Sequence, residues 1–469
     1  MMNKKRSLVT IIKIFFLHIC IMLALGLSLN LSAQVFNQNF PRAEKPELWS
    51  FKPVIFEGLI CYNEDKNSIT LYIIYRLEPK FLTFVKNEET QQEVYIAKAE
   101  IIVEVFDDKG TSLARQFNPV YVESNQPNSE IQPYTNEVQG FFSFKLPPAN
   151  YSMTLEVKDL ATNNIFIDRN INLQLPAFKD KILKSSSIFY VHSADQKLEE
   201  KIKGFKLTNY GGNVIIGQKT DCLLQLILDT NNISGFSWKI KQRVFESDKE
   251  YTTILSDSNF SIIDGIPSIK KINRQLYIHI LDSSNLSKVL RIPIPFERLE
   301  TGKYELEFTL SIDTMKMNFQ ETFEVIWPNQ PRSLSNMNLA IDALHHIATE
   351  KEMLEMKSMN QAKSRQAFKE FWKKRSPDTL CAYNPVMAEY YRRVDEAIRR
   401  FSTKDEQNGY KTDRGRILIL FGSPTKINRI LKPDFPPKEI WTYEKLQQRF
   451  IFIDNERTGN YVLIREEKY

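Results

Sequence analysis

Among the many carboxylates of this chain, two aspartates that lie beside arginines are candidates for an acid–base pair. Asp378 lies beside Arg375 in the stretch FWKKRSPDT, and Asp413 lies beside Arg414 and Arg416 in the stretch GYKTDRGR. Glycoside hydrolysis uses a pair of carboxyl groups of this kind, one of them acting as the acid. The same charges can instead form an ion-pair network that ties helices to a sheet. We favour the network, and the two aspartates are the catalytic candidates.

Motifs that would name another reaction are absent from the sequence. It has no Gly-x-Ser-x-Gly, no His-Glu-x-x-His, no Walker loop and no dinucleotide fingerprint. The adjacent His345 and His346 point in different directions on a helix, which is poor geometry for a metal. The cysteines beyond residue 33 are Cys61, Cys222 and Cys381, which are odd in number and widely spaced. We therefore expect three separate buried thiols, no metal and no cofactor, and we lean toward a protein that is not an enzyme.

The stretch 409–427, GYKTDRGRILILFGSPTKI, contains most of the candidate site, and its residue types also suit structural roles. Residues 416–421 are expected to form a strand buried on both faces. Gly409 is expected to end the preceding loop with a positive φ. Thr412 and Asp413 are expected to fix the turn before the strand by accepting backbone N–H bonds. A structural role for this stretch is the simpler interpretation.

The end of that strand is expected at Gly422, with Ser423 and Pro424 starting a helical turn. Arg414 and Arg416 can each pair with a carboxylate through two hydrogen bonds.

The first two thirds of the chain consist of short strand-like segments. SITLYIIYRL, AEIIVEVFD, GFFSFKL and YSMTLEVKD are β-branched or aromatic and often alternate, and similar segments recur from about residue 186 to 327. Short strands at this spacing are typical of antiparallel sandwiches. We expect two Ig-like β-sandwich domains, at residues 48–176 and 177–328.

A faint internal repeat supports two related sandwiches. LPPANYSMTLEV (Leu146–Val157) aligns with LETGKYELEFTL (Leu299–Leu310), which places Tyr151 over Tyr304. A turn, a tyrosine and then alternating apolar residues is the pattern of a tyrosine corner. Each tyrosine is therefore expected to brace a corner of its sandwich.

The period of the pattern changes after the linker prolines Pro328 and Pro331. Apolar residues at helical spacing predict three helices, within NLAIDALHHIATEKEMLEM, QAKSRQAFKEFWKKR and NPVMAEYYRRVDEAIRRF, the last capped by Asn384 with Pro385 in its first turn. Strands then return in RILILFG, EIWTYE, RFIFIDNE and NYVLIRE. Residues 329–469 are therefore expected to form an α+β domain, with helices first and a small antiparallel sheet after them.

The first 33 residues have the pattern of a secretory signal peptide. MMNKKR supplies positive charge, and the apolar stretch after it ends in small residues, with cleavage expected after Ala33. The alternative is an uncleaved anchor, but Lys13 and His18 interrupt the apolar run. Residues 34–47 are expected to be a linker. We expect an exported protein, in the periplasm or at the cell surface, with at most peripheral contact with a membrane.

Charge is divided unevenly along the chain. Residues 34–330 carry 33 basic and 38 acidic side chains, whereas residues 331–469 carry 26 basic and 19 acidic ones. This polarity favours either contact between the two parts or an anionic partner for the basic part. Charge runs on helices are usually solvated faces, so we expect a protein or an envelope component as the partner and no nucleic acid.

The order of these signals resembles the GWxTD-domain proteins, an exported bacterial family. The naming motif reads Gly409-Tyr410-Lys411-Thr412-Asp413, and the likeness extends to FWKKRSPDT, NPVMAEYYRRV, ILFGSPTKI and EIWTY, roughly residues 335–465. Tyr410 stands where the family has tryptophan, so a role that needs an indole N–H does not transfer. The resemblance implies export and a shared domain, but no established activity, substrate or cofactor. The candidate positions are Gly409, Tyr410, Thr412, Asp413, Arg414, Gly415, Arg416, Gly422, Pro424, Trp372, Arg375, Arg393, Trp441 and Tyr443.

Three functions are compatible with the sequence. The leading one is a non-enzymatic envelope protein that binds or scaffolds through its C-terminal domain. The second is a hydrolase of envelope glycan or peptide that uses Asp413 and Asp378 as acid and base. The third is an envelope-assembly factor, because FGSP, EIWTY and RFIFID follow each other as in small lipoproteins of the outer-membrane assembly machinery. A filled, aromatic core around Trp372, Tyr410 and Trp441 would favour the first.

Overall fold

The computed structural model describes residues 54–63, 68–89, 93–125, 138–176, 184–194, 196–199, 202–228, 233–243, 251–282, 287–312, 315–358, 360–404 and 406–469. The expected signal peptide and linker lie outside these residues. The chain divides into two compact units, with the boundary between Pro328 and Asn329. Asn329 is also the first residue of the C-terminal domain that the sequence predicts. No helix in the described residues is long and apolar enough to cross a membrane.

The first unit is mostly antiparallel β-sheet, as predicted, and the pairing of β13 with β22 is a parallel exception. One sheet holds β1 (Val54–Tyr62), β2 (Ile69–Leu77) and β6 (Val138–Leu146), and a second holds β3 (Val85–Lys86), β4 (Tyr95–Phe106), β5 (Ser112–Ser124), β7 (Asn150–Asp159) and β8 (Ile165–Gln174). A third holds β9 (Lys184–Ser185), β10 (Phe189–His192), β14 (Thr220–Ile227), β17 (Ser261–Asp264) and β20 (Ser287–Pro293). A fourth holds β11 (Gln196–Glu199), β12 (Ile202–Lys206), β18 (Ile266–Ile272) and β19 (Gln275–Leu281). A fifth holds β13 (Val214–Ile215), β15 (Ile233–Arg243), β16 (Tyr251–Asp257), β21 (Gly302–Ile312) and β22 (Met315–Ile326).

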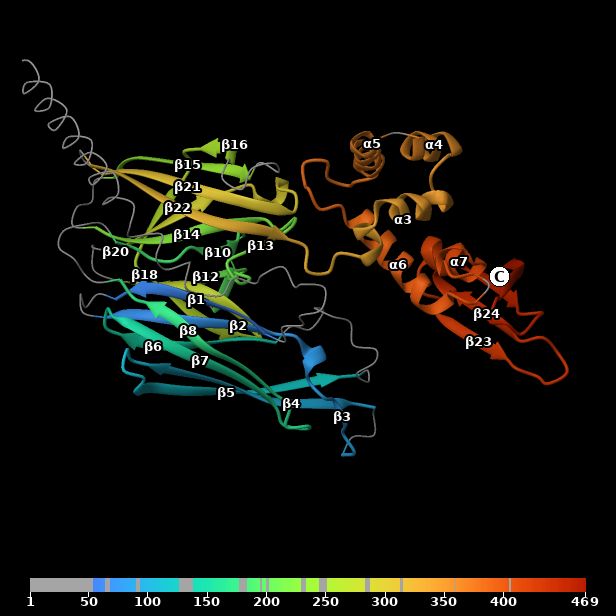
Figure 1. The fold of residues 1–469 in the computed structure, drawn as a ribbon, viewed down its shortest axis with the longest axis horizontal. Helices are drawn as coiled ribbons and strands as arrows, with labels where there is room; N and C mark the ends of the chain where they lie inside the picture. The colour runs from blue at the N-terminus through green and yellow to red at the C-terminus, as the bar shows by residue number, and fades with distance from the viewer. Residues whose placement is uncertain are drawn as a thin grey trace, which may run out of the picture. The chain divides into compact units, whose positions relative to one another are not determined.

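The sheet of β1, β2 and β6 is covered on both faces, and it lies between layers of strands in Figure 1. Because side chains alternate along a strand, Ile60 and Tyr62 enter one apolar cluster while Leu59 and Cys61 enter another. The second cluster includes residues such as Phe189, which follows the predicted boundary at residue 176. The two expected sandwiches therefore share a layer of strands, and the number of separate domains in this part of the chain stays a prediction.

Both tyrosines of the internal repeat brace a corner. The hydroxyl of Tyr151 donates a hydrogen bond to the carbonyl oxygen of Pro147 at 2.7 Å, and that of Tyr304 donates to the carbonyl of Glu300 at 2.8 Å. Each bond reaches back four residues, and each tyrosine is buried at the start of its strand. The corner role predicted from the alignment is confirmed at both positions.

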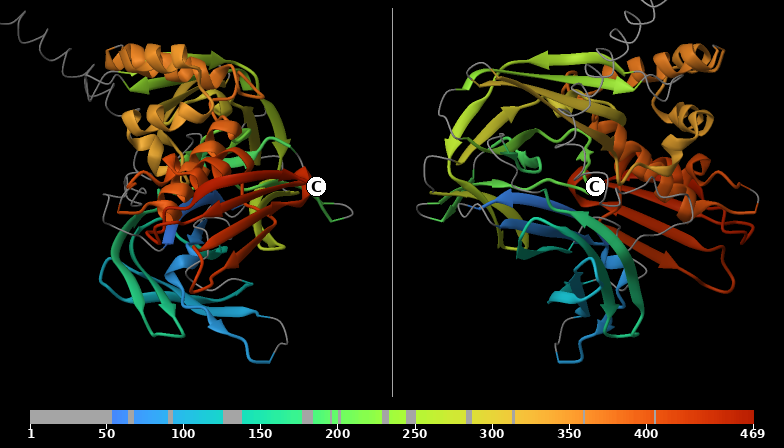
Figure 2. Two further views of the ribbon diagram at one scale, coloured as in Figure 1. Left: turned by 90° about the vertical axis from the view of Figure 1, so that its right-hand side faces the viewer. Right: turned by 60° about the vertical axis from the view of Figure 1, so that its left-hand side comes forward.

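The second unit contains helices followed by a four-stranded antiparallel sheet. The helices are α3 (Met337–Asp342), α4 (Glu350–Ser358), α5 (Gln361–Lys373), α6 (Pro385–Phe401) and α7 (Asp413–Phe421), with short 3₁₀ turns η4 (Arg332–Ser335), η5 (Ala343–His346), η6 (Gly409–Lys411) and η7 (Glu444–Leu446). The strands are β23 (Lys426–Ile430), β24 (Lys438–Tyr443), β25 (Gln448–Ile453) and β26 (Val462–Lys468), paired in that order. Helices and sheet share one apolar core, and Figure 2 shows the four strands of this sheet side by side in orange and red.

Three predictions for the second unit are wrong. The first predicted helix is divided into α3, η5 and α4. Residues 416–421 are the end of helix α7 and not a strand, and β23 takes the expected place of that strand in the sheet. Ser423 and Pro424 do not start a helical turn but link α7 to β23. The caps of α6 are as predicted, since the side chain of Asn384 accepts the backbone N–H groups of Val386 and Met387.

Candidate functional site

The two glycines of the motif are positions where backbones touch. A Cβ atom on Gly409 would lie 2.3 Å from the carbonyl oxygen of Ala397, and one on Gly415 would lie 2.0 Å from the carbonyl oxygen of Gly409. Gly409 does not have the expected positive φ. Its small size, not its conformational freedom, is what the fold needs, because η6 lies against α6 on one side and α7 on the other.

Thr412 joins η6 to the start of α7. Its hydroxyl donates to the carbonyl oxygen of Gly409 at 2.8 Å and accepts the backbone N–H of Gly415 at 3.0 Å. This is the N-cap of the helix, and Asp413 follows it in the first turn, where a negative charge is favourable. Thr412 thus fixes backbone groups as predicted, although it starts a helix and not a strand.

Tyr410 is buried and belongs to a cluster centred on Asp342. Its hydroxyl donates to Oδ2 of Asp342 at 2.7 Å, and the Nζ atoms of Lys411 and Lys357 lie 2.8 and 3.0 Å from that carboxylate. Burial opposes ionisation of Asp342, but the hydrogen bonds from Lys411, Tyr410 and Lys357 outweigh it and hold its pKa well below the usual range. The phenol hydroxyl of Tyr410 is thus a hydrogen-bond donor to a partly buried carboxylate of α3.

His346 contacts the same segment from the other side. Its Nε2 lies 2.8 Å from the carbonyl oxygen of Tyr410, and the ring centroids of His345 and His346 lie 3.6 Å apart with the ring planes tilted by 45°. Burial, with smaller contributions from His345 and Arg416, lowers the pKa of His346 to about 4, while the bond to Tyr410 opposes this shift. The imidazole is therefore neutral at pH 7 and donates to Tyr410.

The pKa of His346 predicts a loss of stability in mild acid. The unfolded chain takes up a proton near the ordinary value of 6.5 and the folded chain only near 4, so stability is complete above pH 6.5 and falls as the pH drops toward 4. We expect a loss on the order of 1–2 kcal/mol between pH 6.5 and 5, where carboxylates remain ionised. Urea unfolding at several pH values measures it. His346→Gln should flatten the curve, whereas an unchanged slope would contradict the assignment; His345→Gln is the exposed control.

Asp413 links α7 to the edge of the sheet. Its Oδ2 accepts the backbone N–H of Leu463 at 2.8 Å, and its Oδ1 lies 3.4 Å from Nη2 of Arg416, one turn along the helix. Helix and sheet are tied together as the network interpretation requires, but a backbone amide of β26 makes the connection. Both ionic side chains of this pair are partly exposed.

Arg414 is the buried arginine of the motif. Its guanidinium lies 4.8 Å from the ring centroid of Phe401 and 4.1 Å from that of Tyr461, and Nη2 donates to the carbonyl oxygen of Gly459 at 2.6 Å. Nη1 lies 3.5 Å from Oε2 of the buried Glu439. Burial lowers the pKa of Arg414, and attraction to Glu439 opposes the shift.

Glu439 collects donors from three directions. Besides Arg414, the Nε of Arg429 binds Oε1 at 3.0 Å, and the indole Nε1 of Trp441 donates to Oε2 at 3.1 Å. Trp441 has 0% exposed surface. The buried carboxylate is thus the centre of an ion-pair network between α7 and β24.

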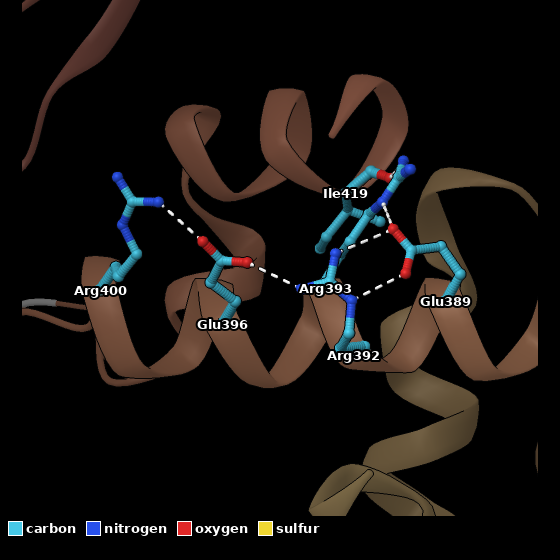
Figure 3. Close-up of polar contacts among 6 residues, drawn as sticks. All are labelled: Glu389, Arg392, Arg393, Glu396, Arg400 and Ile419. Atoms are coloured by element: carbon cyan, nitrogen blue, oxygen red, sulfur yellow. Dashed lines mark hydrogen bonds and ion pairs between the residues drawn. The ribbon is translucent and has the colours of Figure 1, made fainter. Parts of the chain in front are cut away.

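Arg393 connects α6 to the C-terminal end of α7, as Figure 3 shows. Its Nη1 donates to the carbonyl oxygen of Ile419 at 3.0 Å, and its Nε binds Oε1 of Glu389 at 2.7 Å. Hydrogen bonds from Arg392 and Arg393 lower the pKa of Glu389 to about 2. Gly422 has a φ of 78° after the last turn of α7, and its carbonyl oxygen accepts the hydroxyl of Tyr443 at 2.8 Å.

The candidates upstream of α6 form a different group. Trp372 is buried, and its carbonyl oxygen accepts Nδ2 of Asn384 at 2.8 Å. Arg375 stacks 3.5 Å from the ring centroid of Phe371 and pairs with Glu352 at 3.3 Å. Asp378 is exposed, and in the described structure its contacts are local turn contacts such as the bond from the N–H of Leu380. Asp378 therefore does not join the network of Asp413.

Replacing Asp413 and Asp378 separately by alanine distinguishes an aspartate that stabilises the fold from one that holds only a local turn. Asp413→Ala removes the acceptor of Leu463 and the negative charge at the start of α7, so we expect a loss of about 1–3 kcal/mol and a lower melting temperature. Asp378→Ala should change the free energy of unfolding by less than about 0.5–1 kcal/mol. Thermal unfolding followed by circular dichroism measures both. Equal midpoints for wild type and Asp413→Ala would mean that Asp413 is kept for a role other than stability.

Asp342, Glu439, Glu389 and His346 are site residues that sequence reasoning did not select. The spacing of Glu389 and Arg393, four residues apart on a helix, is a signal that could have identified one of them. Asp342 is brought to Tyr410 by the fold and carries no local signal.

The chemistry that the arrangement supports is structural. Tyr410, Thr412, Arg414, Trp372 and Trp441 are buried or nearly so, and the polar groups described above bind neighbouring elements. Among the described residues, no group of three or more His, Cys, Asp or Glu side chains is placed to hold a metal ion. Cys61 and Cys222 are free and buried, whereas Cys381 is free and only half-buried, which corrects the expectation of three buried thiols.

Comparisons with solved structures give weak likenesses. A protein described as membrane anchored from Corynebacterium diphtheriae is 11% identical with a TM-score of 0.15, and the alignment covers 59% of this chain and 60% of that one. The collagen adhesin CNA from S. aureus is 10% identical with a TM-score of 0.14, covering 58% of this chain and 93% of the adhesin. The chain thus spans about 60% of the length of the first of these proteins. Scores this low carry no argument about function.

The family comparison is more informative. No curated protein matches the chain, but residues 308–469 match the model of the GWxTD domain. The match begins in β21, earlier than the resemblance at residue 335 implied, and it covers the motif and network described above. Residues 308–469 thus match the GWxTD domain, which is consistent with a GWxTD domain-containing protein.

Proposed function

We propose that this chain is an exported protein of the cell envelope that binds another protein or an envelope component through its GWxTD domain, without catalysis. The observation that carries the proposal is that the residues of the naming motif hold elements of the fold together. Gly409 and Gly415 are contact points between backbones, Thr412 caps α7, and Arg414 is packed between two rings. The motif then stabilises a scaffold that the family shares, and we assign binding to the exposed surfaces of that scaffold.

The hydrolase alternative is less well supported. It needs Asp413 and Asp378 in one cleft, on either side of a scissile bond. Asp413 holds the edge of β26 and the start of α7, whereas Asp378 holds a turn after α5. The aromatic side chains of Trp372, Tyr410 and Trp441 are 3%, 2% and 0% exposed, which is the filled core expected of a scaffold.

Two measurements on the full chain test the proposal. Expression of the tagged protein in a bacterial host, followed by fractionation and mass spectrometry of the N-terminus, should find it in the envelope fraction beginning at Gln34. Purified protein should then sediment with isolated envelopes and release no reducing ends from peptidoglycan and no free amines from casein. Retention in the cytoplasm, or product release that Asp413→Ala abolishes below its melting temperature, would overturn the proposal.

A further inference from the structure

Strand β23 is an edge of the GWxTD sheet, and its backbone has a defined open side. The sheet order is β23, β24, β25, β26, so among the described residues β23 pairs with β24 alone (Figure 1). The N–H of Asp454 donates to the carbonyl oxygen of Pro437, so the carbonyl group of Pro437 points toward β25. Polar backbone groups alternate in direction along a strand.

This alternation fixes which groups of β23 are unpaired. Residues of β24 at even positions, Lys438, Ile440 and Thr442, then point toward β23, where their register partners are Ile430, Asn428 and Lys426. The N–H and C=O groups of the two residues between them, Ile427 and Arg429, therefore point away from the sheet. They offer a short ladder to an incoming strand.

The opposite edge of the sheet, strand β26, differs from β23 because a side chain of the domain binds its backbone. On β26 the N–H of Leu463 is bound by the carboxylate of Asp413, in the motif that names the family. No comparable side-chain bond to the backbone of Ile427 or Arg429 occurs in the described part of the chain. A side chain of the domain thus binds one backbone group of the β26 edge, whereas no such bond is made to Ile427 or Arg429 in the described residues.

Side chains around the open edge select the kind of strand that can bind. The segment from Lys426 to Lys438 carries four basic residues and one acidic residue, Asp434. Leu431 and Phe435 directly after β23 are 69% and 62% exposed. The side chain of Arg457 binds the carbonyl oxygens of Pro433 and Phe435, so the loop that presents these apolar groups is held in place.

The charge of this edge argues against pairing with a second copy of the chain. Two antiparallel copies of β23 would bring Lys426 and Arg429 of each strand close to those of the other, which is unfavourable. Basic edge residues also protect natural sheets against such self-pairing. An acidic strand meets no such penalty, since its carboxylates pair with these side chains.

We propose that the β23 edge binds an extended, acidic segment of a partner protein by β-strand addition, with an apolar side chain of that segment against Leu431 and Phe435. The proposal rests on the proposed binding function and names its surface and the chemistry of the partner. Backbone groups of Ile427 and Arg429 supply the hydrogen bonds. Lys426 and Lys432 supply the selectivity for acidic side chains, together with the part of the Arg429 guanidinium beyond its bond to Glu439.

A labelled ten-residue peptide, with valine and threonine alternating with glutamate, tests the proposal on the full chain by fluorescence anisotropy. Its lysine counterpart should bind at least tenfold more weakly. Arg429→Pro and Arg429→Ala both remove the guanidinium, but Arg429→Pro also removes an outward N–H that β24 does not use. We expect Arg429→Pro to bind about fivefold more weakly than Arg429→Ala, the effect of one backbone hydrogen bond.

A second measurement does not depend on the folding of a variant. The wild-type chain is titrated with two forms of the acidic peptide, N-methylated at alternate residues on one edge or on the other. One form should bind like the parent and the other should lose binding, because a single edge of the added strand faces β23. Equal affinities of the two forms, equal affinities of the Arg429 variants, or no binding of the parent at millimolar concentration would overturn the proposal. If the two Arg429 variants do not differ in peptide binding but still sediment with envelopes, the proposed function stands. The β23 edge is then not the surface that binds the envelope.

Discussion

Replacement of Gly415 by alanine is expected to destabilise the GWxTD domain by about 3–5 kcal/mol, because the new methyl group overlaps backbone that cannot move aside. Its Cβ would lie 2.0 Å from the carbonyl oxygen of Gly409 and 3.0 Å from the Cα of Tyr410. Alanine is favoured over glycine in a helix by about 1 kcal/mol, which offsets only a part of this overlap. The net effect should be loss of the contact between η6 and α7.

The circular dichroism signal of the helices measures this loss of stability. The α-helices among the described residues all lie after residue 328, so the circular dichroism signal at 222 nm follows the second unit during urea unfolding. Gly235→Ala in the first unit is the control, since its Cβ would meet Ser311 at an ordinary 3.6 Å. We expect it to change the midpoint little. A Gly415→Ala protein with wild-type helical stability would mean that η6 and α7 are not packed as described.

The strand pattern of the first unit could be read from the sequence because it is local. Alternation, turn residues and the tyrosine after each turn predicted antiparallel strands and both tyrosine corners, at Tyr151 and Tyr304. The shared layer could not be predicted in this way. Residues 54–62 are buried along nearly their whole length, and a continuous apolar run does not say which partners cover its two faces.

Helix α7 shows why a short apolar run misleads. ILILF is rich in β-branched and aromatic residues, and its length fits a strand as well as a helix. The deciding signals flank it, namely Thr412 as an N-cap with Asp413 in the first turn, and Gly422 after the last turn. These residues were assigned to the turns of a strand, and the helix was missed for that reason.

The sequence predicted which residues belong to the candidate site, but it did not predict which partners they contact. Arginine–carboxylate pairing was expected, but which carboxylate each arginine meets depends on tertiary packing. Arg414 binds Glu439, Arg416 binds Asp413, and Arg375 binds Glu352. A single sequence gives the charges and their neighbours along the chain, not the partners that the fold brings from a distance.

The two motif arginines should differ sharply when each is replaced by alanine. Arg414 and its partner Glu439 have side chains that are 11% and 5% exposed, whereas Arg416 and Asp413 are 39% and 31% exposed. Removing Arg414 leaves the Glu439 carboxylate buried with less compensation and empties the space between Phe401 and Tyr461. We expect Arg414→Ala to lower the free energy of unfolding by about 3 kcal/mol, because breaking a buried ion pair leaves an uncompensated charge.

Arg416→Ala is the matched control two residues away, with an expected loss of less than about 1 kcal/mol, since exposed ion pairs are screened by water. Urea unfolding followed at 222 nm measures both variants. Part of the loss in Arg414→Ala should be recovered by adding Glu439→Gln, because the amide removes the charge that Arg414 compensated. Glu439 keeps a hydrogen bond from Trp441 and one from Arg429, so the recovery should be incomplete. Equal losses of unfolding free energy for Arg414→Ala and Arg416→Ala would mean that the buried ion pair of Arg414 does not stabilise the fold more than the exposed pair of Arg416. The two arginines would then be candidates for direct contact with a partner.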